Sequence, residues 1–383
     1  MKIIQACIRF PPAPGGVEAH VSSISNELKK IGHEVIVFTS DLYMEIPLKR
    51  LKNYTDTKDI RRFRAYTIGG EAHYIFMPSM LSAFLKENFD IIHCHSYGYF
   101  HLNIGAFVKK IRGKKLVLTP HFHPEWSMWG GKKRKFLRKI YDKFFSKIVL
   151  ESIDRIIFVS KKEMELMGIE NDRCVVIPNG VDINRFSTML DGKKFRNKYG
   201  LEDDKVVLFV GRLASNKGLD FLMECIPNII KEHRKTKFVF VGEDSGMYGR
   251  LLEIIKNLEI NENVLFTGHL SEELLISAYK ACDILVLPSE YEAFGIVLLE
   301  AMACAKPCIG TRVGGITDVI DDGKNGITVE YGKKKEMEEA IVHLLENEKV
   351  CKNMGICGKR KVEEKFTWEK ITKEIENVYK GIN

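Results

Sequence analysis

Short apolar runs alternate with amphipathic segments along almost the whole chain. Lys2–Ile8 and Glu34–Thr39 are strand-like aliphatic runs, and between them Val21, Ile24 and Leu28 recur at the spacing of one helix face. A strand, a helix and a strand in this order form a βαβ unit. Its repetition predicts an α/β fold with parallel, doubly wound sheets.

The alternation falls into two blocks, separated by a polar stretch that follows Pro178-Asn-Gly180. Further strands are predicted at Phe89–Cys94, Lys115–Thr119, Arg155–Val159 and Cys174–Ile177, and then at Val206–Val210, Lys237–Val241, Asn263–Thr267, residues 284–287, Lys306–Ile309 and Gly326–Val329. Three predicted helices, over residues 333–347, 348–364 and 368–380, end the chain. We therefore predict one domain over residues 1–183, a second over 184–365, and a final helical segment over 366–383.

Composition and charge narrow the class of protein. The chain is 45% hydrophobic and 29% charged, without an apolar run long enough to span a membrane. The apolar run at the N-terminus is short and is interrupted by Arg9, which is not typical of a signal peptide, so we expect a cytoplasmic protein. Residues 1–183 hold 29 Lys and Arg against 19 Asp and Glu, whereas the remainder holds 30 against 32. The basic excess indicates an anionic partner for the first domain. Nucleic acid is not predicted, because no nucleic-acid-binding motif occurs.

The stretch Pro288–Cys304 carries the clearest chemistry. A short buried strand ends at Pro288, and a helix is predicted to begin near Phe294 or Gly295. The amides at a helix N-terminus attract phosphate, and the carboxylates of Glu292 and Glu300 can accept hydrogen bonds from sugar hydroxyls. This pattern favours a phosphate site with polyols on both sides. The alternative is that Glu292 only complements the helix dipole and Glu300 is a solvated helix residue.

Glycines and cations follow two other predicted strands. Gly15 and Gly16 lie at the mouth of the first predicted helix, without the G-x-G-x-x-G pattern of nicotinamide- or flavin-binding proteins. Arg212 and Lys217 follow the strand that opens the second domain, where a planar guanidinium and a point charge together suit a diphosphate. A flexible turn at Gly15-Gly16 and a solvated loop at 212–217 are the alternatives.

Taken together, these segments resemble glycosyltransferase family 4, the retaining transferases with the GT-B fold. The matching segments are Gly15-Gly-Val-Glu18, Pro178-Asn-Gly-Val-Asp182, Gly211-Arg-Leu213 with Lys217-Gly218, Val241-Gly-Glu243, Phe266-Thr-Gly268 and Glu292-Ala-Phe-Gly-Ile-Val-Leu-Leu-Glu300. The resemblance implies two Rossmann-like domains facing a cleft, with the final helix crossing back to the first domain.

The resemblance also implies roles for single residues. Arg212 and Lys217 would hold the pyrophosphate of a nucleotide-sugar donor, and Gly16, next to Gly15, would let backbone amides approach it. Glu300 would bind the ribose, and Glu292 the transferred sugar. The remaining donor-binding positions would be Gly242, His269, Leu270, Phe294, Gly295, Ile296 and Val297. His121 would face the donor sugar, with His123 as the alternative.

The implied chemistry is transfer with retention at the anomeric carbon, and His121, Glu292, Arg212 and Lys217 would be its catalytic residues. Because no Asp-x-Asp motif occurs, we predict that the two cations replace a divalent ion and that no cofactor is required. A metal site at the pairs His93/His95 and His121/His123 is an alternative. It is a minor one, because the spacing of these histidines matches no known metal scaffold.

The acceptor is expected to bind the basic first domain. Residues 132–150 predict an amphipathic helix with eight basic residues against Asp142 alone. We expect its apolar face to cover the sheet, while the excess of cations also fits an anionic membrane surface and a lipid-linked acceptor. In the other interpretation, the basic loop 49–64 holds a phosphorylated soluble acceptor. A glycan acceptor is equally compatible, and the sequence sets no oligomeric state.

Three other functions share parts of this pattern. A nucleotide-sugar epimerase would need no acceptor, and a phosphorylase would need a lysine-bound pyridoxal phosphate. A non-catalytic sugar-binding protein would not need the diphosphate cations. Transfer of a hexosyl unit from a UDP- or GDP-sugar to a lipid-linked or other cell-envelope acceptor remains the favoured function.

Overall fold

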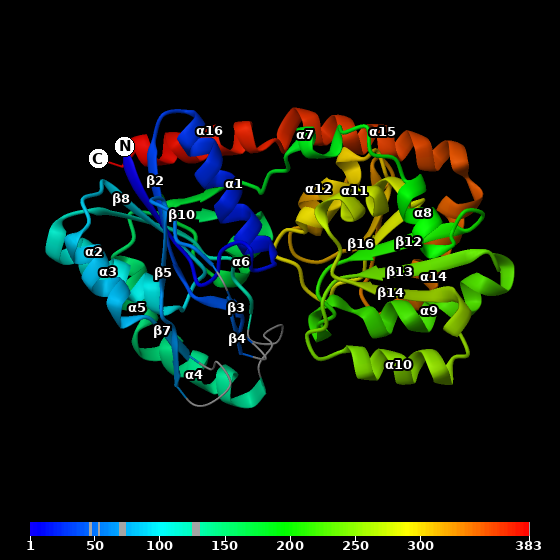
Figure 1. The fold of residues 1–383 in the computed structure, drawn as a ribbon, viewed down its shortest axis with the longest axis horizontal. Coiled ribbons are helices and arrows are strands. Elements are labelled where there is room, and N and C mark those ends of the chain that lie inside the picture. The colour runs from blue at the N-terminus through cyan, green and yellow to red at the C-terminus, as the bar shows by residue number, and fades with distance from the viewer. Residues whose placement is uncertain (46–47, 53, 69–73, 125–130, 383) are drawn as a thin grey trace. The chain divides into compact units, whose positions relative to one another are not determined.

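The computed structural model describes residues 1–382 except 46–47, 53, 69–73 and 125–130, and for residues 68, 131, 133 and 134 it describes the backbone alone. The chain divides into two compact units (Figure 1). The first comprises Met1–Asn179 and Trp368–Asn383, and the second Gly180–Thr367. Each unit is an α/β structure around one parallel sheet.

The sheet of the first unit has seven parallel strands in the order β11-β10-β9-β8-β1-β2-β5. Their bounds are Lys2–Ala6 for β1, Glu34–Ser40 for β2, Ile60–Phe63 for β5, Ile91–His95 for β8, Lys115–Thr119 for β9, Arg155–Phe158 for β10 and Cys174–Val176 for β11. The strand order changes direction at β1, which pairs with both β2 and β8. Ligands bind at such a switch point, beyond the carboxyl ends of the strands.

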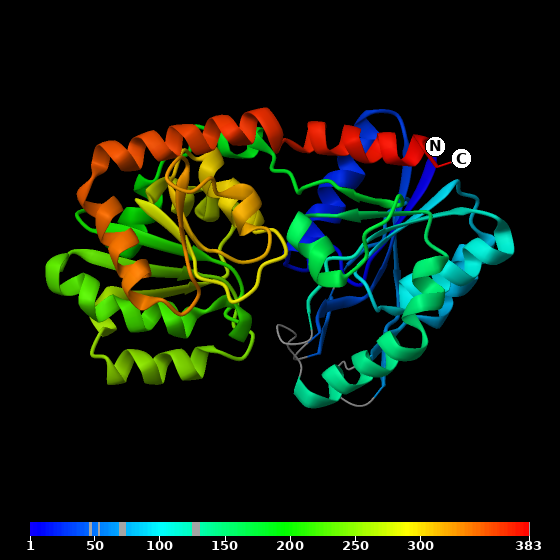
Figure 2. The same cartoon turned by 180° about the vertical axis from the view of Figure 1, so that it is seen from behind.

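Helices cover both faces of this sheet (Figures 1 and 2). The helices of the first unit are α1 (Gly16–Lys30), α2 (Pro78–Lys86), α3 (Phe100–Arg112), α4 (Gly131–Phe144), α5 (Ser146–Glu151), α6 (Lys161–Met167) and α16 (Trp368–Lys380). One face carries α1 and α16, whose Ile24, Leu28, Ile371 and Ile375 pack with Ile3 of the sheet. Helices α2, α3 and α5 contribute to the core on the other face.

The prediction for the first domain was incomplete between β2 and α2. Ile60–Phe63 lies within the segment predicted as a basic loop, yet it forms the parallel edge strand β5 beside β2. Two small antiparallel pairs, β3 (Leu42–Met44) with β4 (Lys49–Arg50) and β6 (Tyr66–Ile68) with β7 (Tyr74–Phe76), were also not predicted. Charged residues obscured the strand pattern of β5, because an edge strand tolerates them.

The second unit repeats the arrangement with six strands in the order β14-β13-β12-β15-β16-β17. Their bounds are Lys205–Val210 for β12, Thr236–Val241 for β13, Val264–Gly268 for β14, Ile284–Leu287 for β15, Cys308–Thr311 for β16 and Gly326–Val329 for β17. The helices are α7 (Ile183–Phe186), α8 (Lys193–Tyr199), α9 (Leu219–Glu232), α10 (Tyr248–Asn257), α11 (Glu272–Ala281), α12 (Ile296–Ala303), α13 (Ile316–Val319), α14 (Lys334–Glu346) and α15 (Glu348–Lys365), with short 3-10 turns at Ser215–Lys217 and Asn261–Asn263. Here the switch point lies at β12.

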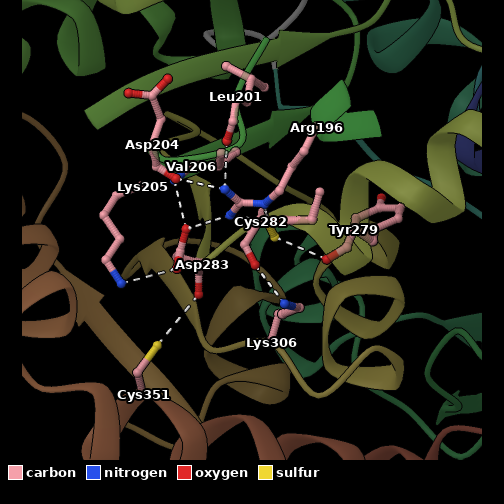
Figure 3. A network of polar contacts seen from close by, with 11 residues as sticks. Arg196, Leu201, Asp204, Lys205, Val206, Tyr279, Cys282, Asp283, Lys306 and Cys351 are labelled. Atoms are coloured by element: carbon pink, nitrogen blue, oxygen red, sulfur yellow. Dashed lines mark hydrogen bonds and ion pairs between the residues drawn. The ribbon is translucent and has the colours of Figure 1, made fainter. Parts of the chain in front are cut away.

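A polar network fixes the amino ends of the central strands of this unit (Figure 3). The guanidinium of Arg196, on α8, donates to the carbonyl oxygens of Leu201 and Asp204 and to the carboxylate of Asp283. Asp283 also accepts from the backbone amide of Val206 at 2.8 Å. The network therefore lies at the sheet edge opposite the carboxyl ends, where it holds β12 and β15 together.

Among the described residues, no helix combines the length and the apolar character needed to cross a bilayer.

Candidate functional site

Loops that follow β12, β15 and β16 interlock at the carboxyl edge of the second sheet. The amide of Glu290 donates to the carbonyl oxygen of Asn216 at 3.0 Å, and the amide of Gly315 donates to that of Glu292 at 2.9 Å. Gly218 has a φ of +62°, and a Cβ there would collide with the carbonyl oxygen of Pro288. These approaches demand glycine, and they bring the segments 212–218 and 288–295 side by side.

Lys217 and Glu292 meet in this interlocked region. The Lys217 ammonium pairs directly with the Glu292 carboxylate, and each side chain is 16% exposed. The hydroxyl of Ser289 donates to the same carboxylate at 3.4 Å. The structure thus brings together a predicted phosphate ligand and a predicted sugar ligand that are far apart in sequence.

The N-terminus of α12 lies between the two predicted carboxylates. Gly295 precedes the helix with a φ of +92°, which favours glycine. The amides of Ile296 and Val297 belong to its first turn and lack carbonyl partners within the helix. Phe294 is buried and packs on Phe366, so it anchors the loop. An anion placed here would meet the positive end of the helix dipole.

Glu300 is held by two residues that the sequence did not single out. Arg185, on α7, donates to its carboxylate at 3.3 Å, and the Tyr279 hydroxyl, on α11, donates at 2.5 Å. Burial raises the pKa of Glu300, and the neighbouring Arg185 cation opposes that rise. The carboxylate is therefore fixed in orientation and is not a solvated helix residue. In the sequence, the only indication that Arg185 belongs to the site is its position close to the Pro178–Asp182 motif. Nothing in the sequence indicated that Tyr279 would contact Glu300.

Arg212 and Gly242 lie where the loops after β12 and β13 join. The amide of Leu213 donates to the carbonyl oxygen of Glu243 at 2.9 Å, on one side of Arg212. Gly242 packs so closely on Gly211 that a Cβ would collide with its carbonyl oxygen. Farther along this edge, after β14, His269 is exposed and Leu270 is buried.

In the first unit, Gly15 and Gly16 begin α1 as predicted. Gly15 is the N-cap residue and Gly16 the first residue of the helix. Glu18 is buried in the first turn and pairs with Arg9 at 2.7 Å. Gly15 has a φ of +150°, which favours glycine, and an added Cβ would displace the Glu18 carboxylate.

His121 follows β9 in a left-handed conformation, with a φ of +43°. Its ring lies 4.8 Å from that of His20 and 5.7 Å from that of His95, between ring centroids. The buried Glu163 accepts from the backbone amide of Phe122 at 2.6 Å and so holds the loop that carries His121. The sequence had not indicated that His20 would join this group.

The expectation for the basic segment 132–150 was wrong. It forms two helices, α4 and α5, and only part of its apolar face enters the core. Val149 is buried, whereas the exposed apolar residues are Phe136, Leu137, Ile140, Phe144, Phe145 and Ile148. Helices α2 and α3 supply core residues on this side of the sheet, and the six apolar side chains remain exposed.

The basic loop predicted to hold a phosphorylated acceptor uses several of its cations internally. Arg50 pairs with Asp41 at 2.5 Å, and Arg61 pairs with Glu87 at 2.7 Å. Arg62 is buried and donates to the carbonyl oxygen of Pro11. These contacts indicate that the cations of segment 49–64 stabilise the fold of the first unit.

Comparison with known proteins yields consistent matches. Residues 14–185 match the family described as Glycosyltransferase Family 4, and residues 191–361 match Glycosyl transferases group 1. An uncharacterized glycosyltransferase of Methanocaldococcus jannaschii is 30% identical, over 99% of this chain and 98% of its own length. The N-acetyl-alpha-D-glucosaminyl L-malate synthase of Bacillus anthracis is 28% identical, over 96% and 94%. The solved structure of Anabaena HepE in complex with UDP-glucose aligns with a TM-score of 0.77 at 20% identity, covering 99% of both chains.

Proposed function

Because the chain belongs to glycosyltransferase family 4, in the group 1 glycosyltransferases, we propose that it transfers a hexosyl unit from a UDP- or GDP-sugar with retention of configuration. The observation that carries this proposal is the set Lys217, Glu292 and Glu300 around the N-terminus of α12. The complex of HepE with UDP-glucose supports a nucleotide sugar as donor.

Charge development explains why these residues suit the reaction. As the anomeric C–O bond breaks, the sugar gains oxocarbenium character and the diphosphate gains negative charge. Lys217, Arg212 and the amides of α12 would stabilise that diphosphate before the reaction begins, as preorganised electrostatic groups do. Glu292 now holds the Lys217 ammonium. A bound diphosphate would compete for this ammonium and leave the carboxylate available to sugar hydroxyls.

Glu300 would recognise the ribose hydroxyls. With Arg185 and Tyr279 fixing its orientation, the carboxylate loses little conformational freedom on binding, which favours affinity. In the first unit, Gly16 would admit the donor phosphates close to the backbone, and His121 would contact the transferred sugar. Acceptor attack would occur on the face that the diphosphate leaves, with a phosphate oxygen as base.

A screen of UDP-, GDP- and ADP-sugars by thermal shift tests the donor, since a ligand that binds only the folded protein raises its Tm. We expect one class of nucleotide sugar to raise the Tm, and Lys217→Ala and Glu300→Ala each to abolish most of the shift and of the slow release of nucleoside diphosphate. Lys334→Ala is the matched control, because it removes a surface ion pair with Glu224 in the same unit. Near-native donor binding and turnover in both site variants would refute the assignment.

For the acceptor, we propose a lipid-linked molecule at an anionic membrane surface. Helices α4 and α5 expose Phe136, Phe144 and Ile148 to 63%, 59% and 65%, among the exposed cations Lys132, Lys143 and Lys147. Aromatic and aliphatic side chains interleaved with lysines suit the boundary between headgroups and acyl chains. Each cation near an anionic bilayer adds attraction of about 1 kcal/mol.

Sedimentation with vesicles tests this docking. We expect binding to vesicles rich in phosphatidylglycerol, little binding to phosphatidylcholine alone, and a clear loss in Ile148→Ser. Ile356→Ser is the matched control, because Ile356 on α15 is 63% exposed. The membrane proposal fails if the protein sediments with neither kind of vesicle at low salt, or if Ile148→Ser and Ile356→Ser both bind as wild type does. The donor assignment is unaffected by either result.

A further inference from the structure

Three histidines from separate segments of the first unit meet at the carboxyl edge of its sheet. His20 lies on α1, His95 ends β8 and His121 follows β9. One ring nitrogen of each lies within 4.8 Å of the corresponding nitrogens of the other two. His20 and His95 are 1% and 0% exposed. They lie near the switch point at β1, where sheets of this kind bind ligands.

Hydrogen bonds fix the proton positions on two of these rings. His20 Nδ1 lies 2.5 Å from Asn179 Oδ1, and His95 Nε2 lies 2.7 Å from Gln5 Oε1. The Gln5 amide nitrogen donates to the Tyr379 hydroxyl, which identifies its oxygen as the atom facing His95. Because an amide oxygen only accepts, each ring must carry its hydrogen on the bonded nitrogen. The opposite nitrogens, His20 Nε2 and His95 Nδ1, then present lone pairs.

These lone pairs are buried without a partner. Within the described part of the chain, His20 Nε2, His95 Nδ1 and His121 Nε2 are all inaccessible and make no hydrogen bond. Leaving a buried polar atom unsatisfied is unfavourable, and the two lone pairs fixed on His20 and His95 repel each other. A cation that accepts electron pairs would remove both problems.

The partners that orient two of the rings also suit metal binding, because a metal-binding imidazole donates its other ring N–H to a fixed acceptor. The Asn179 and Gln5 oxygens occupy the place of the second-shell acceptors that orient metal-binding histidines.

We propose that His20, His95 and His121 bind one divalent transition-metal ion, with Zn²⁺ as the best-suited common ion. Three imidazoles are a frequent zinc ligand set, and they leave the fourth tetrahedral position open. Zinc–nitrogen bonds of about 2.0–2.1 Å require the three nitrogens to draw closer than they are here. His121 is only partly buried and lies on a loop, so its ring is the one that moves.

This inference differs from the prediction of no metal and does not depend on the proposed transfer reaction. The sequence offered the neighbouring pairs His93/His95 and His121/His123. In the structure, His93 uses both ring nitrogens for hydrogen bonds, to Tyr379 and Thr119. One histidine from each pair joins His20 instead. The ion would hold β8, β9 and α1 together, and it would leave Nδ1 of His121 free of the metal.

The test uses the full-length chain without a histidine tag. We expect elemental analysis of the purified protein to find about one zinc per chain, and chelation followed by titration with Zn²⁺ to restore a higher Tm. His20→Gln and His95→Gln should lose the bound metal and the Tm response. His33→Gln is the control, because the His33 side chain is only 9% exposed and lies in the same unit outside the trio.

A second-shell variant keeps the test decisive if a ligand variant fails to fold. Asn179→Ala removes the acceptor for His20 and should weaken Zn²⁺ binding about tenfold or more. If wild type retains no metal and its Tm does not respond to added Zn²⁺, or if His20→Gln binds Zn²⁺ as tightly as His33→Gln, the site does not exist. Donor binding is scored separately, by the loss of the nucleotide-sugar thermal shift in Lys217→Ala, a residue of the second unit, so failure of the metal site and failure of the transfer site are distinguishable.

Discussion

Replacing Gly218 by alanine tests whether the close approach of the loops builds the donor site. Gly218 follows Lys217, has a φ of +62°, and would place an added Cβ against the carbonyl oxygen of Pro288, closer than real Cβ contacts allow. Gly200, in the same unit, has a φ of +63° with nothing within 4 Å of an added Cβ. The two substitutions therefore share the cost of a left-handed alanine and differ in the collision.

The expected magnitudes follow from this difference. A left-handed alanine costs about 1–2 kcal/mol, so Gly200→Ala should lower the free energy of unfolding by that amount. Gly218→Ala adds an overpacking cost of about 1–3 kcal/mol. For a unit of this size, each kcal/mol lowers the Tm by about 2–4 °C. The collision should also displace Lys217 from Glu292, because the 212–218 loop must move away from Pro288.

Thermal unfolding and donor titration measure the two effects. We expect the unfolding transition of Gly218→Ala to lie several degrees below that of Gly200→Ala, and its affinity for the nucleotide sugar to fall at least tenfold. Gly200→Ala should bind the donor as wild type does. Equal losses of stability in the two variants, or unchanged donor affinity in Gly218→Ala, would refute the argument that this approach shapes the site.

Three further substitutions probe buried polar groups. Tyr279→Phe removes a hydrogen bond to Glu300 and should lower donor affinity by the roughly 1.5–3 kcal/mol typical of bonds to charged groups; an unchanged Kd by calorimetry would contradict this. Burial raises the pKa of Glu163 to about 7, so its charging disfavours the folded state as pH rises from about 4.5 to about 7. The glutamine in Glu163→Gln does not titrate, so the Tm of this variant relative to that of wild type should rise between about pH 5 and pH 8. A Tm difference that stays constant with pH would contradict the raised pKa of Glu163. Tyr379→Phe leaves His93 and Gln5 without their shared partner and should cost about 1–3 kcal/mol in denaturant unfolding, whereas a loss within error would show that the bonds contribute little.

Local sequence was sufficient for most of the elements. The strands Lys115–Thr119 and Gly326–Val329 and the helix Trp368–Lys380 have the predicted bounds. These predictions depend on alternation and periodicity, which are properties of neighbouring residues. The family, and with it the two Rossmann-like units, likewise followed from short motifs in a fixed order.

Tertiary structure decided what packs against what. The apolar side of α4 had the pattern of a core helix, but periodicity states only that one face is apolar and not whether another element covers it. The predicted loop 49–64 contains the edge strand β5, which exists because β2 offers it hydrogen bonds.

The candidate sites show the same division. The motifs around Lys217, Glu292 and Glu300 could be identified from the sequence, because each combines a glycine, a charged residue and a predicted helix start within a few residues. Arg185 and Tyr279 were not, since they reach Glu300 from other helices. The trio of His20, His95 and His121 exists only in three dimensions, because parallel strands bring their carboxyl ends to one edge regardless of their separation along the chain.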